Sequence, residues 1–260
     1  MGGDLTLAAP VRSWRVAAAS VRGAAHARGE APCQDAHGWS PLPDGGLVAA
    51  VADGAGTAAL GEVGARTAVD ALVELVRRAL EEGGGGADPA AALCDAFPAA
   101  LAAVRDEAQA RGVDLSALAT TLVAAVATPE RTVAAQVGDG AIVVRDAGGS
   151  IRSLEVGGRR GEYLNETVFL TSPGALDPLP SMTWEAPASH LALLTDGLQL
   201  LALRLPAGTP HPPFFEPLFR FVEQEPDAGR ASERLRAYLA SPKIGARTED
   251  DVTLLLAALT

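Results

Sequence analysis

Aspartates at the ends of apolar strands are the residues of this sequence best placed to do chemistry. Three of them follow an apolar run and precede a glycine, in VAAVAD-G at Asp53, AAQVGD-G at Asp139 and LALLTD-G at Asp196. In a fourth place the order is reversed, because Asp250 and Asp251 come directly before the apolar run VTLLLAAL. A glycine after a strand permits a tight turn and the close approach of a ligand. The pattern predicts that these carboxylates, distant in sequence, meet at one rim of a sheet.

Carboxylates gathered at one rim repel one another and resist the loss of water, so they require a compensating positive charge. No cluster of lysine and arginine accompanies these motifs. Oxygen ligands select hard cations such as Mg²⁺ or Mn²⁺ over zinc. Two such ions, about 3.5–4 Å apart, would lower the pKa of a shared water enough to yield a nucleophile. A single Asp-Gly pair is more often an ordinary turn, as in DAGG at Asp146, so the prediction depends on the whole set.

The elements that must position these residues can be predicted from apolar periodicity. Strands are expected at 14–21, 47–53, 190–196 and the C-terminus, with several in quick succession from about 119 to 156. Helices are expected over about 58–80, from 89 to about 111, from 197 to about 203 and over 229–240. Three stretches are interpreted as irregular, namely HARGEAPCQDAHGW as a loop, PHPPFFEP as an interruption, and 157–189 as a flap over the site.

The order of these elements distinguishes between fold classes. It is not the regular alternation of strand and helix that a doubly wound parallel sheet requires. One strand, two helices, a run of antiparallel strands, further helices and a last strand instead suit a layered α+β domain. The sequence contains no internal repeat and no convincing boundary, so residues 1–260 are predicted to form a single domain.

Composition limits the classes of partner. The 260 residues are 48% hydrophobic, enough for a sizeable core, and carry a formal net charge of -11. Such an acidic chain is a poor electrostatic match for nucleic acid or an anionic membrane. No apolar run reaches about 18 residues, and the N-terminus lacks the pattern of a secretion signal. We therefore expect a monomeric, cytoplasmic protein with reduced thiols and with neither nucleic acid nor membrane as a partner.

Other chemistries fit the sequence less well. The stretch DGAGTAA resembles a dinucleotide-binding loop, but Asp53 would place a negative charge beside the pyrophosphate. Cys33 and Cys94 do not begin the C-x₅-R loop of cysteine phosphatases, and no G-x-S-x-G elbow is present. His26 and His37 lack metal-binding spacing. They flank Asp35, so either could bond to a group around the proposed site.

Taken with their flanking residues, the motifs resemble those of the metal-dependent protein phosphatases of the PP2C (PPM) family, especially its compact bacterial branch. The matches run in order along nearly the whole chain, as PCQDAHG, VADGAGT, ATTLVAA, VGDGAIVV, LLTDGL and TEDDVTLLL. The resemblance implies a four-layer α-β-β-α sandwich with two mostly antiparallel sheets. It also implies hydrolysis of phosphoserine or phosphothreonine by a hydroxide that bridges two Mn²⁺ or Mg²⁺ ions. The partner would be a phosphorylated protein, such as a kinase or a kinase target.

The resemblance assigns roles residue by residue. Asp35, Asp53, Asp196 and Asp250 take the positions of the catalytic metal ligands. Asp53 would bridge the two metals, and the backbone carbonyl of Gly54 would bind one of them.

Two further acidic residues match family positions with less direct roles. Asp139 takes the place where many bacterial members hold a third, looser metal. Asp251 takes the place of an asparagine in the closing motif.

The chain departs from the family pattern near the expected phosphate anchor. Glu30 stands where the family usually has an arginine, while Arg22, His26 and Arg28 lie nearby. Arg28 is the predicted anchor, because a guanidinium binds phosphate as a two-pronged donor.

Other departures concern the first two acidic motifs. Gln34 replaces a more usual acidic residue, and Ala55 replaces a histidine found in eukaryotic relatives. The missing arginine leaves open a pseudophosphatase that binds a phosphoprotein without turnover. A third alternative is a metal-dependent hydrolase that acts on a small phosphorylated metabolite.

Overall fold

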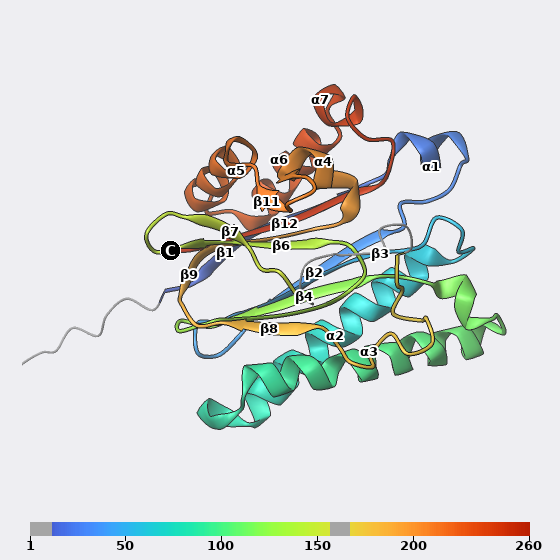
Figure 1. Ribbon diagram of the computed structural model, residues 1–260, viewed down its shortest axis with the longest axis horizontal. Coiled ribbons are helices and arrows are strands. Elements are labelled where there is room, and N and C mark those ends of the chain that lie inside the picture. The colour runs from blue at the N-terminus through green and yellow to red at the C-terminus, as the bar shows by residue number, and fades with distance from the viewer. Residues whose placement is uncertain (1–11, 157–166) are drawn as a thin grey trace, which may run out of the picture.

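The computed structural model describes residues 12–156 and 167–260, and its elements lie in four layers (Figure 1). Helices α2 (Gly61–Glu82) and α3 (Pro89–Arg111) cover one five-stranded sheet. Helices α5 (Pro212–Gln224) and α6 (Ala228–Leu239) cover the other. The strand pairings are antiparallel, so the predicted α-β-β-α sandwich is confirmed.

The first sheet has the order β2-β3-β4-β5-β8. Its strands are β2 (Asp35–Pro41), β3 (Leu47–Asp53), β4 (Leu122–Ala127), β5 (Thr132–Val137) and β8 (Ser181–Trp184). The second sheet has the order β1-β12-β9-β6-β7. Its strands are β1 (Trp14–Val21), β12 (Val252–Leu259), β9 (Ala188–Leu194), β6 (Ala141–Asp146) and β7 (Ile151–Ser153).

Shorter elements connect these layers. The short helices are α1 (Ala24–Arg28), α4 (Gln199–Ala202), α7 (Pro242–Gly245), and the 3₁₀ turns η1 (Gly84–Gly86), η2 (Leu115–Leu118) and η3 (Asp196–Leu198). The strands β10 (Leu203–Arg204) and β11 (Thr209–Pro210) pair only with each other.

The continuous apolar strands of the sequence are buried on both faces. Along β3, Leu47, Ala49 and Val51 point into the core between the two sheets. The alternate residues Val48 and Ala50 point toward the core beneath α2 and α3. A strand alternates its side chains between two faces, so burial of both faces requires an unbroken apolar run. Small alanine and valine side chains fill these layers, as expected in a chain with few aromatic residues.

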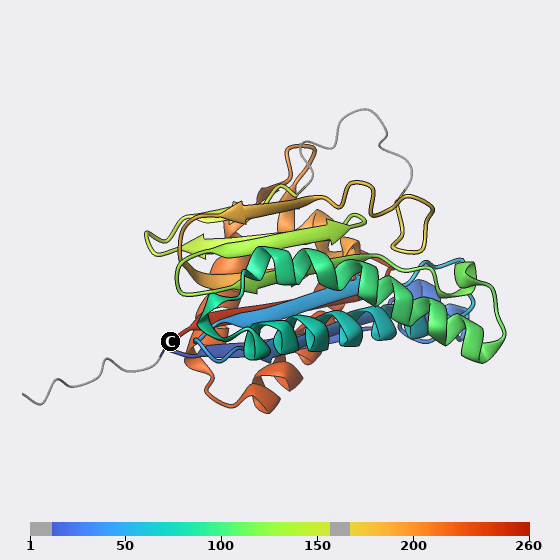
Figure 2. The same ribbon diagram turned by 90° about the horizontal axis from the view of Figure 1, so that it is seen from below.

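The two long helices lie side by side across the outer face of the first sheet (Figure 2). The side chain of Asp88 accepts hydrogen bonds from the backbone N–H groups of Ala90 and Ala91, so it caps α3 at the predicted start of this helix. This cap satisfies donors that the first helical turn leaves free. Helix α3 ends at Gly112, whose φ of 67° lies in the left-handed region that glycine adopts readily.

The structure corrects the predicted loop at 26–39 and the predicted interruption at 210–217. Part of the first stretch forms α1, and β2 pairs residue by residue with β3. The second stretch begins α5, in which Phe215, Leu218 and Phe219 are buried at helical spacing. The turn-forming residues suggested irregular structure, but pairing with β3 and burial of the phenylalanines decide the conformation instead.

The segment predicted as a flap is partly regular. Residues 157–166 lie outside the described residues, whereas Ser181–Trp184 form β8 and pair with β5 at the edge of the first sheet. Between them, Thr167 donates a hydrogen bond of 2.8 Å from Oγ1 to Oδ2 of Asp139. Separately, no helix within the described ranges is both long and apolar enough to cross a bilayer.

Candidate metal centre

The strand-end aspartates come together at one end of the sandwich. Asp35 begins β2 and Asp53 ends β3, and the two residues oppose each other in the strand register. In the second sheet β9 ends two residues before Asp196, and β12 begins two residues after Asp250. Leu194 of β9 pairs with Leu254 of β12, so both aspartates lie at the same end of that sheet. Thr195 joins the two sheets there, because its Oγ1 donates to Oδ2 of Asp35 at 2.7 Å.

Asp53 is the centre of this group. Its carboxyl lies within electrostatic range of those of Asp35, Asp196 and Asp250. Burial raises the pKa of Asp53, and the charges of Asp35, Asp196 and Asp250 raise it further. Its backbone N–H donates to Oγ1 of Thr121 at 2.9 Å, which fixes the end of β3. A cation bound here would offset this repulsion, and its binding would compete with that of protons.

Asp35 is the most enclosed of the four predicted catalytic carboxylates, with 6% of its surface exposed. Burial raises its pKa to about 7, although hydrogen bonds from Thr195 and Thr253 act in the opposite direction. Its Oδ1 is buried and has no hydrogen-bond partner in the described part of the chain. An unpartnered buried carboxylate oxygen is costly, and it fits a position that awaits a cation.

Asp196, which follows β9 of the second sheet, also combines a raised pKa with a buried oxygen that lacks a partner. Burial raises its pKa, with further contributions from the charges of Asp139 and Asp250. Its Oδ1 is also buried without a hydrogen-bond partner among the described residues. Asp250, by contrast, is exposed at the outer side of the group. Asp139 lies in the turn between β5 and β6, close enough to act on Asp196 electrostatically.

The donor set fits hard divalent cations. Within residues 12–156 and 167–260, no three acidic, histidine or cysteine side chains are close enough together to hold an ion by themselves. An ion bound here would therefore draw part of its shell from water or from backbone oxygen, as Mg²⁺ commonly does. The buried, unpartnered oxygens of Asp35 and Asp196 and the mutual repulsion around Asp53 are the features that such an ion would satisfy.

Two glycines let the backbone approach closely around this rim. A β carbon on Gly54 would lie 2.4 Å from the carbonyl of Gly61, at the start of α2. A β carbon on Gly197 would lie 2.0 Å from the backbone oxygen of Asp251. Neither place can hold a larger residue without movement of the main chain, so both glycines keep the aspartate loops in contact with their neighbours.

Asp251 has a structural role that its sequence position did not fully reveal. It is 2% exposed, and its two oxygens accept the backbone N–H groups of Gly23 and Gln34, each at 2.6 Å. Nδ1 of His26 lies 2.9 Å from its Oδ2. This carboxylate therefore ties α1 and the start of β2 to the start of β12. The partners are more than 200 residues apart in sequence, so the only available signal was the second aspartate of the DD pair.

The predicted phosphate anchor lies at the surface. Arg28 ends α1, and its Nη2 forms an ion pair of 2.7 Å with Oε2 of Glu249, next to Asp250. The side chains of both partners are more than half exposed. Cys33 is partly buried, and burial together with nearby Asp35 and Asp251 raises the pKa of its thiol to about 12. A thiol held in the protonated form is a weak nucleophile.

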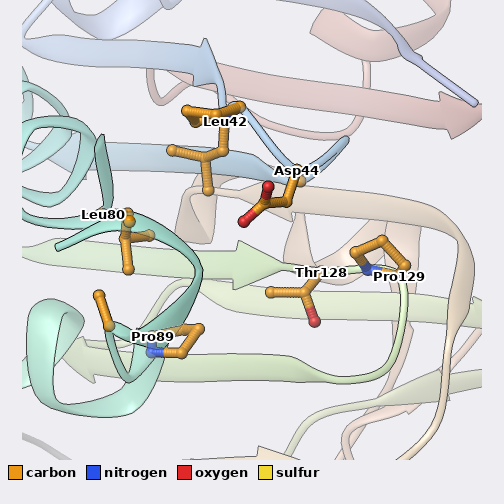
Figure 3. Close-up of a pocket in the computed structure, with 10 residues that line it drawn as sticks. Leu42, Asp44, Leu80, Pro89, Thr128 and Pro129 are labelled. Carbon is orange, nitrogen blue, oxygen red and sulfur yellow. The ribbon is translucent and has the colours of Figure 1, made fainter. Parts of the chain in front are cut away.

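A cleft of about 480 Å³ adjoins Asp35 on the side of α2 and α3. Its lining includes Glu62 and Arg66 from α2 and Arg111 from the end of α3. A second, much smaller cavity of about 60 Å³ lies at the opposite end of the β2–β3 hairpin (Figure 3). Figure 3 shows Asp44 there among Leu42, Leu80 and the two prolines Pro89 and Pro129. It could hold only a few waters, and it is remote from the gathered carboxylates.

Comparisons with known proteins show the family to which the chain is similar. Residues 22–240 match the family described as protein phosphatase 2C. The chain is 33% identical over 251 residues to serine/threonine-protein phosphatase 3 of Escherichia coli (strain K12), covering 94% of this chain and 98% of that protein.

Solved structures share the fold at lower identity. The catalytic domain of the phosphatase PstP in complex with two manganese ions has a TM-score of 0.63 and 20% identity, covering 96% of this chain and 99% of that one. Stp1 from Staphylococcus aureus has a TM-score of 0.62 and 17% identity, covering 100% of this chain and 99% of that one.

Proposed function

The chain belongs to the protein phosphatase 2C family, and on this premise we propose which of its residues perform the reaction. It is a serine/threonine protein phosphatase, a hydrolase of phosphoric monoesters on phosphorylated proteins. The observation that carries the assignment of residues is that Asp35 and Asp53 oppose each other in the strand register, at the end of the sandwich where Thr195, next to Asp196, hydrogen-bonds to Asp35.

Asp35, Asp53, Asp196 and Asp250, with the backbone carbonyl of Gly54, hold two divalent cations in this proposal, either Mn²⁺ or Mg²⁺. The buried, unpartnered oxygens of Asp35 and Asp196 support it, and PstP is a relative of similar fold solved with two manganese ions. When bound, such cations acidify a shared water and offset charge on the phosphoryl oxygens.

The chain's own groups hold these ligands in place. Oγ1 of Thr195 fixes the orientation of Asp35, and the hydroxyl of Thr121 fixes the backbone at Asp53. Supporting contacts of this kind orient the ligands, and their loss typically costs about 10- to 100-fold in metal affinity or activity. Asp139 would hold a third, weaker cation, and the hydrogen bond from Thr167 would orient its carboxylate.

Arg28 is the proposed guanidinium contact for the substrate phosphate. It lies on the same segment as the expected anchor, and its guanidinium can form two parallel hydrogen bonds to phosphate. Because both of its terminal nitrogens already bind Glu249, a substrate would have to compete with that carboxylate.

The cellular setting follows from charge and family. The substrate is a phosphorylated protein. We propose that the substrate is a kinase or a kinase target in a bacterial signalling pathway, and that the enzyme acts in the cytoplasm as a monomer. The net charge of -11 argues against nucleic acid and anionic membranes as partners.

Hydrolysis of p-nitrophenyl phosphate, with and without Mn²⁺, tests this function in the wild type and in Asp53→Ala. We expect turnover that needs Mn²⁺ and disappears in the variant. Metal-independent turnover would contradict the mechanism, and binding of a phosphopeptide without turnover would indicate a pseudophosphatase. Comparison of a phosphoserine peptide with small phosphate esters at equal concentration separates a protein phosphatase from a small-molecule enzyme.

A further inference from the structure

The imidazole of His26 lies between Asp251 and the loop that follows Asp53, although no sequence motif assigned it a role there. His26 belongs to α1, which packs against the start of β12 through the hydrogen bond between Gly23 N–H and Asp251. Its side chain is 17% exposed, so the ring is held within the structure and still reaches the surface. A ring in this position can be oriented by the protein and can also meet a ligand.

One edge of the ring faces a buried carboxylate. Nδ1 of His26 lies 2.9 Å from Oδ2 of Asp251, whose side chain is 1% exposed. The two atoms are at ion-pair distance, although they are not aligned as a linear hydrogen bond. Asp251 is itself fixed by the N–H groups of Gly23 and Gln34. A histidine with one nitrogen beside a fixed carboxylate has its ring orientation set by that contact.

The other edge of the ring faces the loop that follows Asp53. A β carbon built on Gly56 would lie 3.9 Å from Nε2 of His26, and Gly56 itself is exposed. Gly56 is three residues beyond Asp53, the centre of the carboxylate group. Nε2 therefore lies next to the exposed loop that follows Asp53.

We propose that Nε2 of His26 donates a hydrogen bond to a phosphoryl oxygen of the substrate, and that Asp251 acts as the positioning residue for this ring. The proposal rests on the phosphatase function described above. In this arrangement Nδ1 faces the buried carboxylate of Asp251 and Nε2 faces the phosphoryl group. Arg28 must first leave Glu249, whereas Nε2 already faces the loop after Asp53.

Two amide substitutions separate contact with substrate from support of the fold. His26→Asn keeps an N–H group near the place of Nδ1, so it can still bind Asp251 but presents nothing at the place of Nε2. His26→Gln carries its N–H group farther out, near the place of Nε2. His211→Asn, which changes a histidine at the start of α5, is the matched control. Arg28→Ala, measured beside them, compares the two candidate contacts.

The measurements are kcat and KM on a phosphoserine peptide, the inhibition constant of inorganic phosphate, and Mn²⁺ affinity by calorimetry. We expect His26→Asn to raise KM and the phosphate inhibition constant about 10- to 100-fold, the loss of one hydrogen bond to a charged group. Mn²⁺ affinity and melting temperature should stay near the wild-type values. His26→Gln should recover part of the loss.

Several results would overturn the proposal. If His26→Asn matches the wild type in KM and phosphate inhibition, Nε2 does not contact the substrate. If the variant instead loses Mn²⁺ affinity and melting temperature together, the ring is only structural. A wild type without Mn²⁺-dependent turnover would contradict the proposed function itself, and this inference with it. The two failures are therefore distinguishable.

Discussion

Asp35 and Asp53 stand directly opposite each other on β2 and β3, one at the beginning and one at the end of the same hairpin. Two carboxylates in opposed positions of a sheet repel each other, and both lose water on folding. The sandwich therefore keeps at its rim an arrangement that destabilises the metal-free protein. Natural proteins retain such arrangements chiefly where a ligand requires them.

Asp53→Asn should separate stability from activity. The amide keeps the shape of the side chain and is neutral without taking up a proton. We expect the free energy of unfolding of the metal-free protein to rise by roughly 1–2 kcal/mol, since folding no longer has to place a carboxyl with a raised pKa among other carboxyls. Phosphatase activity should fall by at least about 100-fold, because loss of a metal ligand costs at least as much activity as loss of a residue that hydrogen-bonds to a ligand. Urea unfolding in EDTA and turnover with Mn²⁺ test the two halves.

The control for this variant is Asp146→Asn in the β6–β7 hairpin, which should change neither quantity appreciably. A metal-free Asp53→Asn protein less stable than the wild type would show that Asp53 supports the fold rather than opposing it.

Metal addition should stabilise the wild type in proportion to its occupancy. A cation at about 100 times its dissociation constant contributes about 2.7 kcal/mol. For a chain of this size, that corresponds to a rise in melting temperature of roughly 5–10 °C. Asp35→Asn and Asp196→Asn should abolish most of the rise, because each removes a buried oxygen that lacks a protein partner. An equal rise in wild type and variants would place the binding of Mn²⁺ elsewhere.

Asp251→Ala should destabilise the fold, unlike a change at its neighbour. Two buried N–H groups, from Gly23 and Gln34, would lose their acceptor. We expect the free energy of unfolding to fall by about 3 kcal/mol. The exposed Asp250→Asn should change it by less than about 0.5 kcal/mol while reducing Mn²⁺ affinity. Denaturant unfolding measures the stability of the two variants, and calorimetry measures their Mn²⁺ affinity. Equal losses of stability in the two variants would refute this division of roles.

The stability of the protein should depend on His190 below neutral pH. Burial lowers the pKa of this histidine to about 4, against about 6.5 when unfolded. Arg145 lowers it further and Glu223 opposes the shift, while the ring packs on Phe219. The unfolded chain therefore binds a proton that the folded chain refuses, and stability is lost as pH falls from 6.5 to 4.

The size of this effect is about 3 kcal/mol at most. It is measured as the difference between the wild type and His190→Gln in urea unfolding at pH 4.5 and pH 7.5, both in EDTA. Subtracting the unfolding free energies of the two proteins cancels the contribution of the rim carboxylates, whose raised pKa values change stability in the opposite direction as pH falls. A difference that does not change with pH would show that His190 is not buried in its neutral form.

The strand-end aspartates could be predicted from the sequence because the residues next to each one form a recognisable pattern. An apolar run followed by aspartate and glycine marks Asp53 and Asp196 without knowledge of the fold. The strand β2 could not be predicted this way, since DAHGWSP contains a glycine and a proline, and pairing with β3 holds it extended. The contact between His26 and Asp251 forms only because β12 pairs with β1 in the folded chain. No local pattern in the sequence could predict it.

Gly197→Ala should show how closely the Asp196 turn and β12 depend on each other. A β carbon at Gly197 would lie 2.0 Å from the backbone oxygen of Asp251, a distance that forces main-chain movement. That movement would displace Asp196 on one side and the Asp250–Asp251 pair on the other. We expect the free energy of unfolding to fall by about 2 kcal/mol or more, and Mn²⁺ affinity to fall with it.

Gly245→Ala is the matched control, because a β carbon there meets open space. It should leave stability and metal affinity near the wild-type values. If Gly197→Ala lowers Mn²⁺ affinity without lowering stability, the turn can move independently of β12. If Gly197→Ala changes neither stability nor Mn²⁺ affinity, the geometry of the site does not depend on contact between the Asp196 turn and the start of β12.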